Sequence, residues 1–237
     1  MQRKRLAPVL AVAGGAIVLV LALVIALSLG SKTKSSPNTV NLNMTASIGE
    51  MLQGIPQHGT VLGNPKAKVT LTEFGDPQCS ACASFSSNGL PNLIQNYVRA
   101  GKLRIEYQGQ TFVDKYVKGS TDSVRLLRTA LAGGEQNRLW NFIEIVYDNQ
   151  GSEDSGYATD SYLKAVCNAI PGLDVNKAFA AASQSNAFAA QINASAARFN
   201  AEGFSATPSF LVGLTGQKQE KVSEVDLTAR INALSKS

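Results

Sequence analysis

The sequence predicts an α/β domain that carries a helical insertion and follows one transmembrane helix. The first observation is a pair of strand-like segments, residues 69–73 and 102–107, in which apolar and polar side chains alternate. The segment between them has the apolar spacing of a helix. The second is a long middle stretch, residues 119–201, whose apolar residues recur at helical spacing. The third is residues 6–29, which carry no charge and are long enough to cross a bilayer as one helix.

These observations divide the chain into three parts. Residues 1–30 form the predicted N-terminal anchor, and residues 31–54, which are rich in polar side chains, form a flexible linker. Residues 55–237 form the folded domain, with the helical insertion at about 119–201.

Basic residues flank the apolar run on both sides. Three of them, at positions 3–5, precede it, so the positive-inside tendency keeps the N-terminus in the cytoplasm. Lys32 and Lys34 on the far side weaken this bias without reversing it. A cleaved secretory signal is the alternative, with residues 26–28 (Ala-Leu-Ser) as its cleavage site, although that site lies inside the run. In either case the domain is exported, as an anchored or as a secreted protein.

The net charge of +5 does not indicate a nucleic-acid partner. Five basic residues flank the apolar run, and no acidic residue occurs before Glu50. Removing these five from the 22 basic residues leaves 17, which equals the 17 acidic residues. The folded domain is therefore neutral and offers no electrostatic basis for binding a phosphate backbone.

The domain is expected to begin with a short edge strand. Residues 55–62 have strand-like composition, but Pro56 and Gly59 interrupt them. His58, the only histidine, lies in this segment away from other ligand-forming residues, so we interpret it as an exposed edge-strand side chain.

The central strand leads directly into two cysteines. Gly75, Asp76 and Pro77 end the strand, and Cys79 and Cys82 then lie three residues apart in the first turn of a helix. Two thiols at this spacing can form a disulfide, and the positive end of the helix dipole stabilises a thiolate on the first. The pattern predicts redox chemistry.

Glu73 is the candidate proton donor or acceptor of this site. Strand alternation places it on the same face as Val69 and Leu71, where burial would raise the pKa of its carboxyl. It precedes Cys79 by six residues, so we expect it to exchange a proton with Cys82. The alternative is a glutamate at the strand end that reaches solvent.

A helix and a second strand should follow the cysteines. Pro91 is expected to kink or divide the helix, Gly101 to end it, and residues 102–107 to form a strand parallel to the first with a right-handed crossover.

The insertion should begin with a helix capped within residues 120–122, and Thr159 or Asp160 should cap a later one. We expect residues 179–199 to form one further helix. Cys167 lies on an apolar helix face, which indicates a buried small hydrophobe; a regulatory or intermolecular thiol is the alternative.

The C-terminal part begins with Thr207 and Pro208, which directly precede an apolar strand at residues 210–212. A last strand at 218–222 and a helix at 224–234 complete the expected order of elements.

Residues 63–82, with their Gly-Asn-Pro-Lys-Ala leading into the strand before Cys-Ser-Ala-Cys, resemble the DsbA-like thiol–disulfide oxidoreductases. The resemblance implies a thioredoxin-like fold with an inserted helical subdomain. It also implies that Glu73 is the acidic residue near the cysteine pair. Thr207 and Pro208 would form a cis-proline loop that binds an extended substrate strand. A quinone-linked membrane protein of the DsbB or vitamin-K-epoxide-reductase type would reoxidise the pair.

The residue inventory argues against bound metal or haem. A structural zinc site needs four ligands, and only His58 and Cys167 remain besides the pair. Covalent haem would require a histidine directly after Cys82, where Ala83 stands. We therefore expect no cofactor beyond the redox-active Cys79–Cys82 disulfide.

The predicted function is an exported protein thiol–disulfide oxidoreductase. Cys79 would attack, Cys82 would resolve, and unfolded exported proteins would be oxidised. The alternatives are a reductase or isomerase of the same fold, and a tethered binding module or chaperone whose disulfide is structural. Ser80 and Ala81 leave the direction of electron flow open, since no histidine between the cysteines hydrogen-bonds the thiolate.

Overall fold

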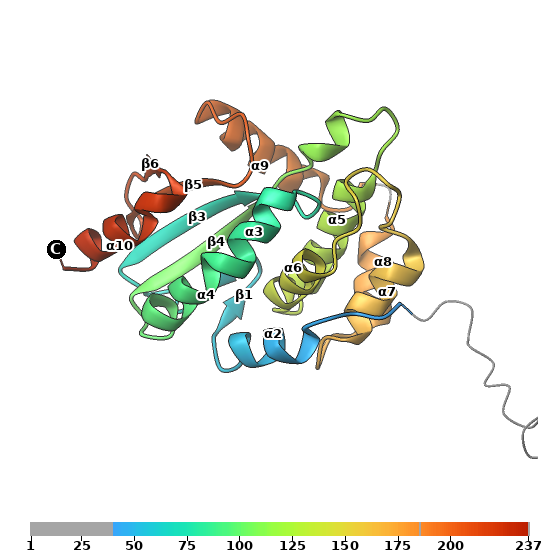
Figure 1. Cartoon of the computed structure of the whole chain (residues 1–237), viewed down its shortest axis with the longest axis horizontal. Coiled ribbons are helices and arrows are strands. Elements are labelled where there is room, and N and C mark those ends of the chain that lie inside the picture. The colour runs from blue at the N-terminus through green and yellow to red at the C-terminus, as the bar shows by residue number, and fades with distance from the viewer. Residues whose placement is uncertain (1–39, 185, 237) are drawn as a thin grey trace, which may run out of the picture. The chain divides into compact units, whose positions relative to one another are not determined.

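The computed structural model describes residues 40–184 and 186–236 (Figure 1), which include a six-stranded mixed sheet. The strand order is β1-β2-β4-β3-β5-β6, and only β3 and β4 pair in parallel. The strands are β1 (Gln57–His58), β2 (Val61–Leu62), β3 (Val69–Gly75), β4 (Leu103–Gly109), β5 (Ser209–Leu214) and β6 (Glu220–Val222).

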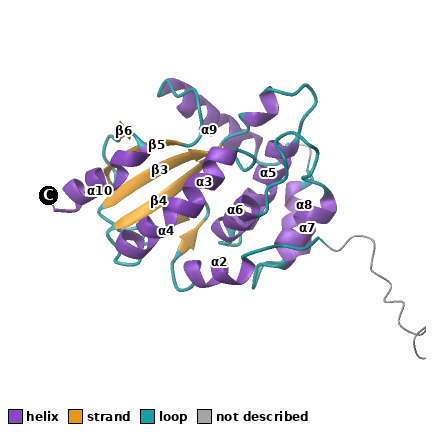
Figure 2. Cartoon of the chain, in the orientation of Figure 1, coloured by secondary structure: helices purple, strands orange, loops and turns teal. Residues whose placement is uncertain are grey.

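Strand β3 lies inside the sheet, between β4 and β5, and all seven of its residues are buried. Val69, Leu71 and Glu73 face one side, where the main core contains the aromatic and aliphatic side chains of the helices that follow Cys79. Phe74 faces the other side and packs with Phe199 and Leu211. Both faces are therefore covered, as Figure 2 shows for the helices in purple around the orange strands.

The crossover between β3 and β4 consists of three short helical segments: α3 (Ser80–Asn88), α4 (Leu90–Leu93) and a π-helical turn, η1 (Ile94–Val98). The predicted division of this helix is confirmed, with Pro91 in the first turn of α4. Gly89 separates α3 from α4, and a Cβ there would lie 2.6 Å from the Phe85 ring. Gly101, with a φ of +67°, ends the segment as predicted.

The insertion between β4 and β5 contains a short 3-10 turn, η2, and five α-helices. They are η2 (Val113–Lys115), α5 (Asp122–Gly134), α6 (Leu139–Asp148), α7 (Asp160–Asn168), α8 (Val175–Ala182) and α9 (Ala189–Ala201). Helix α6 is buried on nearly all sides, since it lies between α2, α3, α5 and α7.

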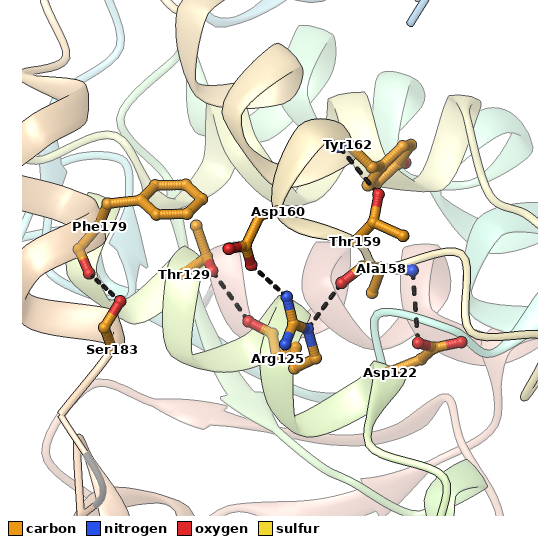
Figure 3. A network of polar contacts seen from close by, with 9 residues as sticks. All are labelled: Asp122, Arg125, Thr129, Ala158, Thr159, Asp160, Tyr162, Phe179 and Ser183. Atoms are coloured by element: carbon orange, nitrogen blue, oxygen red, sulfur yellow. Dashed lines mark hydrogen bonds and ion pairs between the residues drawn. The ribbon is translucent and has the colours of Figure 1, made fainter. Parts of the chain in front are cut away.

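Arg125 of α5 ties the insertion to the segment that precedes α7 (Figure 3). Its guanidinium donates to the backbone oxygen of Ala158 at 2.7 Å and forms an ion pair with Asp160. Thr159 caps α7 as predicted, because its hydroxyl accepts a hydrogen bond from the Tyr162 amide.

Two predictions about helices were wrong. Residues 179–199 do not form one helix, because α8 ends at Ala182 and α9 begins at Ala189, after Phe188 with a φ of +57°. Part of the predicted linker, residues 45–52, forms helix α2 (Thr45–Leu52) instead. Ile48 and Leu52 of this helix are buried in the main core, and this packing stabilises the short helix.

The edge of the sheet is a hairpin rather than one interrupted strand, since β1 and β2 pair across Gly59 and Thr60. At the other end, β5 and β6 form the predicted C-terminal strands. A 3-10 turn, η3 (Glu224–Asp226), and helix α10 (Leu227–Lys236) follow, and Ile231 of α10 is fully buried.

The predicted membrane helix at residues 6–29 lies outside the described residues. Among residues 40–184 and 186–236, no helix has the length and apolar character that a membrane crossing requires.

Candidate active site

The predicted site residues meet where β3 ends and β5 begins. Antiparallel pairing sets Phe74 opposite Ser209, so the turn after β3 lies beside the loop that precedes β5. This turn carries Cys79 at the start of α3, and the loop carries Thr207 and Pro208. Residues separated by more than a hundred positions are thus brought together by one strand pair.

Asp76 organises the turn between β3 and α3. Its Oδ1 accepts hydrogen bonds from the Gln78 amide at 2.9 Å and the Ser123 hydroxyl at 2.7 Å, and its Oδ2 accepts one from the Val113 amide at 2.9 Å. Its own carbonyl accepts from the Cys79 amide at 3.0 Å. Burial raises the pKa of Asp76 to about 7, although these hydrogen bonds oppose the shift.

Sequence reasoning had assigned Asp76 only the role of ending the strand. The side chain of an aspartate in a turn commonly accepts a hydrogen bond from the backbone amide two residues later. The contact of Asp76 with the Gln78 amide was therefore detectable in the sequence. Its contacts to Val113 and Ser123 in the insertion were not, because they depend on the tertiary fold.

Cys79 is the more accessible thiol of the pair and occupies the N-cap position of α3. Its Sγ lies 3.3 Å from the backbone oxygen of Thr207. A hydrogen bond from Cys82 lowers the pKa of Cys79 to about 6, and the Thr207 hydroxyl and the Ala81 and Cys82 amides add to this effect against the opposing burial. Within residues 40–184 and 186–236 that hydroxyl has no other hydrogen-bond partner, so it can donate to the thiolate.

Cys82 has the opposite character. Its side chain is completely buried, and burial raises the pKa of its thiol well above the ordinary value. The hydrogen bond to Cys79 acts in the same direction, as does the nearby charge of Glu73. One turn of helix therefore separates the more accessible Cys79, which favours a thiolate, from the completely buried Cys82, which favours a thiol.

Thr207 and Pro208 are joined by a cis peptide bond. Thr207 is buried and Pro208 half-buried, so the loop forms a wall beside Cys79. The sequence resemblance had implied this bond, whereas local sequence alone gave no means of distinguishing cis from trans.

Glu73 is buried in the layer between β3 and the helices, with 2% of its surface exposed. Among the described residues, its Oε2 has no hydrogen-bond partner. Burial raises the pKa of Glu73 well above its ordinary value, and the negative charges of Glu144 and Glu224 raise it further. The alternative of a glutamate that reaches solvent is therefore wrong.

A loop of the insertion also contacts the start of α3. The sequence did not predict this contact. Gln150 donates to the backbone oxygens of Pro77 at 2.8 Å and Cys79 at 3.3 Å. Glu153 Oε1 accepts a hydrogen bond from the Ser80 amide at 3.0 Å. The carboxylate of Glu153 thus occupies part of the positive helix end that the Cys79 thiolate also faces.

The remaining thiol and the imidazole lie apart from the pair, since His58 belongs to β1 and Cys167 to α7. Cys167 is 1% exposed and burial raises the pKa of its thiol to about 12. In the described part of the chain, no group of three or more His, Cys, Asp or Glu side chains is arranged to hold a metal ion. The arrangement around Cys79 is instead suited to thiol–disulfide exchange.

Comparison with known proteins agrees with this geometry. A family model described as "Thioredoxin" matches residues 56–233. The "Disulfide bond formation protein D" of Bacillus subtilis is 28% identical over 128 residues, which are 51% of this chain and 54% of that protein. The "Probable disulfide bond formation protein D" of Bacillus cereus is 28% identical over 117 residues, 49% of this chain and 52% of that protein. The chain spans about half the length of these curated relatives.

Solved structures show the same fold. The oxidised BdbD of Bacillus subtilis has a TM-score of 0.64 at 19% identity and covers 77% of this chain and 98% of its own. The alpha-DsbA1 of Wolbachia pipientis has a TM-score of 0.60 at 19% identity and covers 78% and 92%. The predicted thioredoxin-like fold with its helical insertion is confirmed.

Proposed function

The chain belongs to the thioredoxin family, and we propose that it is a DsbA-like thiol–disulfide oxidoreductase that oxidises exported proteins through Cys79 and Cys82. The names of the Bacillus relatives, which describe disulfide bond formation, support this direction of the reaction.

The observation that carries the proposal is the split in acidity between two adjacent thiols. Cys79 has a pKa of about 6, so it is a thiolate at neutral pH, whereas burial keeps Cys82 protonated. A stabilised thiolate favours the reduced form of the pair, and this makes its disulfide a better oxidant. A structural disulfide in a binding module would have no need of such a difference.

In the oxidising direction, a substrate thiolate attacks Cys79 Sγ in the Cys79–Cys82 disulfide and forms a mixed disulfide. Cys82 leaves with the electron pair of the broken bond and takes a proton from Glu73. A second substrate thiolate then attacks the substrate sulfur of the mixed disulfide, and Cys79 leaves as a thiolate. The substrate loses two electrons and gains a disulfide, and the cysteine pair gains both electrons.

Thr207 and Pro208 would hold the substrate during these steps. The backbone oxygen of Thr207 already lies 3.3 Å from Cys79 Sγ, so a substrate backbone aligned along this loop would bring its cysteine to Cys79 Sγ. Because the loop offers backbone groups, we expect recognition of extended, unfolded chains with little dependence on sequence.

We further propose that residues 6–29 anchor the protein in the cell membrane with the domain outside the cytoplasm, the secreted form after signal cleavage being the alternative. A membrane protein of the DsbB or vitamin-K-epoxide-reductase type would then return the pair to its disulfide form, as the family resemblance implies. The exported environment favours oxidation over reduction.

The decisive experiment measures the reduction potential of the Cys79–Cys82 pair in glutathione buffers, together with the recovery of activity by a reduced, scrambled test protein. A potential above about −200 mV with efficient oxidation supports the proposal. A potential near or below about −270 mV would support a reductase or isomerase instead. A pair that glutathione cannot reduce would indicate a binding module with a structural disulfide.

Two variants control this experiment. Cys79→Ser removes the sulfur that the substrate thiolate attacks and should abolish oxidation. Cys167→Ala removes the buried third thiol, which lies in α7, and should leave both the potential and the rate unchanged. Loss of oxidation in Cys167→Ala would show that the third thiol takes part in the reaction.

A further inference from the structure

A second buried carboxyl, Glu144 of α6, lies behind the active site. Only 2% of its surface is exposed, and its Oε2 accepts a hydrogen bond from the Ser86 hydroxyl of α3 at 2.6 Å. No cationic side chain is hydrogen-bonded to it or forms an ion pair with it among the described interactions. A buried acid without a cation is costly to ionise, so its retention in an otherwise apolar helix calls for a reason.

Glu144 lies on the same side of the sheet as Glu73. Tyr147 is one turn further along α6, and its hydroxyl lies 3.1 Å from that of Tyr107. A Cβ placed on Gly75 would lie 2.9 Å from the Tyr147 hydroxyl and 3.2 Å from Glu73 Oε1. The Tyr147 hydroxyl and the Glu73 carboxyl therefore converge on the end of β3, and α6 brings Glu144 into the same layer.

The two carboxyls also influence one another electrostatically. The charge of Glu144 is the largest cause, after burial, of the raised pKa of Glu73, and the charge of Glu73 in turn raises the pKa of Cys82. Cys82, Glu73 and Glu144 thus form a succession of buried acidic groups in which the charge of Glu144 raises the pKa of Glu73 and that of Glu73 raises the pKa of Cys82.

At its far end this succession reaches a surface cavity of about 180 Å³. Glu144 and Ser86 line the cavity together with polar and apolar side chains of α2, α3 and α6, among them Ser47, Ser87 and Asp148. These three helices lie side by side (Figure 1). The volume and the polar groups are sufficient to hold several water molecules.

This cavity is separate from the substrate side of the molecule, since neither cysteine of the pair nor Thr207 or Pro208 contributes to its lining. Helices α2 and α3 present only uncharged side chains to it, and Asp148 is the other acidic group at its wall. A substrate chain bound along Thr207 and Pro208 would cover Cys79 without covering this second opening.

We propose that Glu144 passes protons between Glu73 and the water of this cavity, so that the proton exchanged at Cys82 enters and leaves behind the substrate. The inference deepens the proposed function and rests on it. When Cys82 leaves the disulfide as a thiolate, Glu73 gives it a proton, Glu144 gives its own proton to Glu73, and the cavity water restores the proton on Glu144. During reoxidation the same groups carry one proton outward before Cys82 attacks Cys79.

Proton release during reoxidation of the cysteine pair offers the sharper test. A reduced protein treated with oxidised glutathione first forms a mixed disulfide on Cys79 and releases one glutathione thiolate. Cys82 then loses its proton and attacks Cys79 Sγ, which forms the intramolecular disulfide and releases the second glutathione thiolate. Rapid acid quenching and mass spectrometry of the intact protein follow the second step separately from the first.

Glu144→Gln keeps an oxygen for Ser86 but cannot carry a proton. We expect it to slow the second step by about tenfold at neutral pH, since a positioned acid–base group contributes substantially to proton transfer. In the wild type this step should accelerate as the pH rises through the pKa of Glu144, which burial raises to about 8. That acceleration should be absent in Glu144→Gln, and the first step should be unchanged.

Ser86→Ala tests the same path without removing the carboxyl. The Ser86 hydroxyl lowers the pKa of Glu144, so its loss should move the pH profile of the second step to higher pH. Glu135→Gln, which removes an exposed carboxyl after α5, serves as the matched control and should match the wild type.

A wild-type rate and pH profile in Glu144→Gln would overturn the inference. An equal slowing at every pH would also overturn it, because this would indicate a role in packing alone. Failure of the wild type to complete both steps would instead contradict the proposed function, so the two failures are distinguishable.

Discussion

The Sγ atom of Cys79 lies 3.3 Å from the backbone oxygen of Thr207, which is 128 residues further along the chain. This contact joins the start of α3 to the loop before β5, across the strand pair of β3 and β5. The Cys79 sulfur therefore lies against the surface that we propose receives the substrate backbone.

Thiolate absorbance of the reduced protein should titrate with a midpoint near pH 6, the value to which the contacts of Cys79 lower its pKa. In Glu153→Gln the midpoint should fall further, because the carboxylate bound to the Ser80 amide no longer repels the thiolate. Glu153 is exposed, so the difference from the wild type should shrink as salt is added. An upward shift would show that Glu153 stabilises the thiolate instead.

In Cys82→Ala, the Cys79 thiolate should attack disulfides of oxidised substrates and stay joined to one substrate sulfur as a mixed disulfide, with the other substrate sulfur released as a thiolate, because no Cys82 thiol remains to displace the substrate. Non-reducing electrophoresis followed by peptide mass mapping would identify the trapped bond. The matched variant Cys79→Ala should trap little, since Cys82 is completely buried and protonated. Trapping by Cys79→Ala alone would reverse the roles of the two cysteines.

Asp76→Asn should lower the free energy of unfolding by about 1–3 kcal/mol at pH 8. The NH₂ group of the asparagine is a donor, and it would face either the Val113 amide or the Gln78 amide and Ser123 hydroxyl, which are donors too. Buried donors would therefore be left without an acceptor. Urea unfolding measures the change. Asp226→Asn, in an exposed turn, should change the stability by much less.

The stability of the protein should fall as the pH rises from about 4.5 to about 8, and Glu144 should contribute to this slope. The folded state holds the Glu144 proton over this range, because its pKa is raised from 4.5 to about 8, whereas the unfolded state has lost it. Each pH unit within the range therefore removes up to about 1.4 kcal/mol. Glu144→Gln should unfold at a higher urea concentration than the wild type at pH 8.5 and show a smaller slope, and an unchanged slope would contradict this assignment.

The parts of the site that sequence analysis predicted are those with local signals. Cys79 and Cys82 follow a period-2 strand, and Glu73 keeps the alternation of Val69 and Leu71 on the buried face. These patterns depend only on backbone geometry, which residues a few positions apart determine by themselves.

The residues that were missed depend on distant packing. Glu144 lies in the stretch 119–201 whose spacing predicts helices, but only the contacts of α6 with α2, α3, α5 and α7 make its position buried. Glu153 reaches the start of α3 from a loop whose sequence shows no preference for that contact.

Helix α2 was missed for a related reason. It has only eight residues, with Gly49 in its interior, so its apolar side, with Ile48 and Leu52, gave a weak signal. The helix is held in place by that packing and by Arg99, whose guanidinium donates to the carbonyls of Glu50, Met51 and Gln53.

The docking of α2 on the domain limits how far the enzyme can search for substrates if residues 6–29 are anchored. Val40 and Leu42 pack against the core and Asn43 is hydrogen-bonded to Asn149, so residues 30–39 remain as the tether. Even a fully extended chain of this length spans only about 35 Å. A domain held this close to the membrane would contact polypeptides as they emerge from it rather than polypeptides that have already diffused away. Lengthening the tether would widen this working radius without touching the chemistry at Cys79.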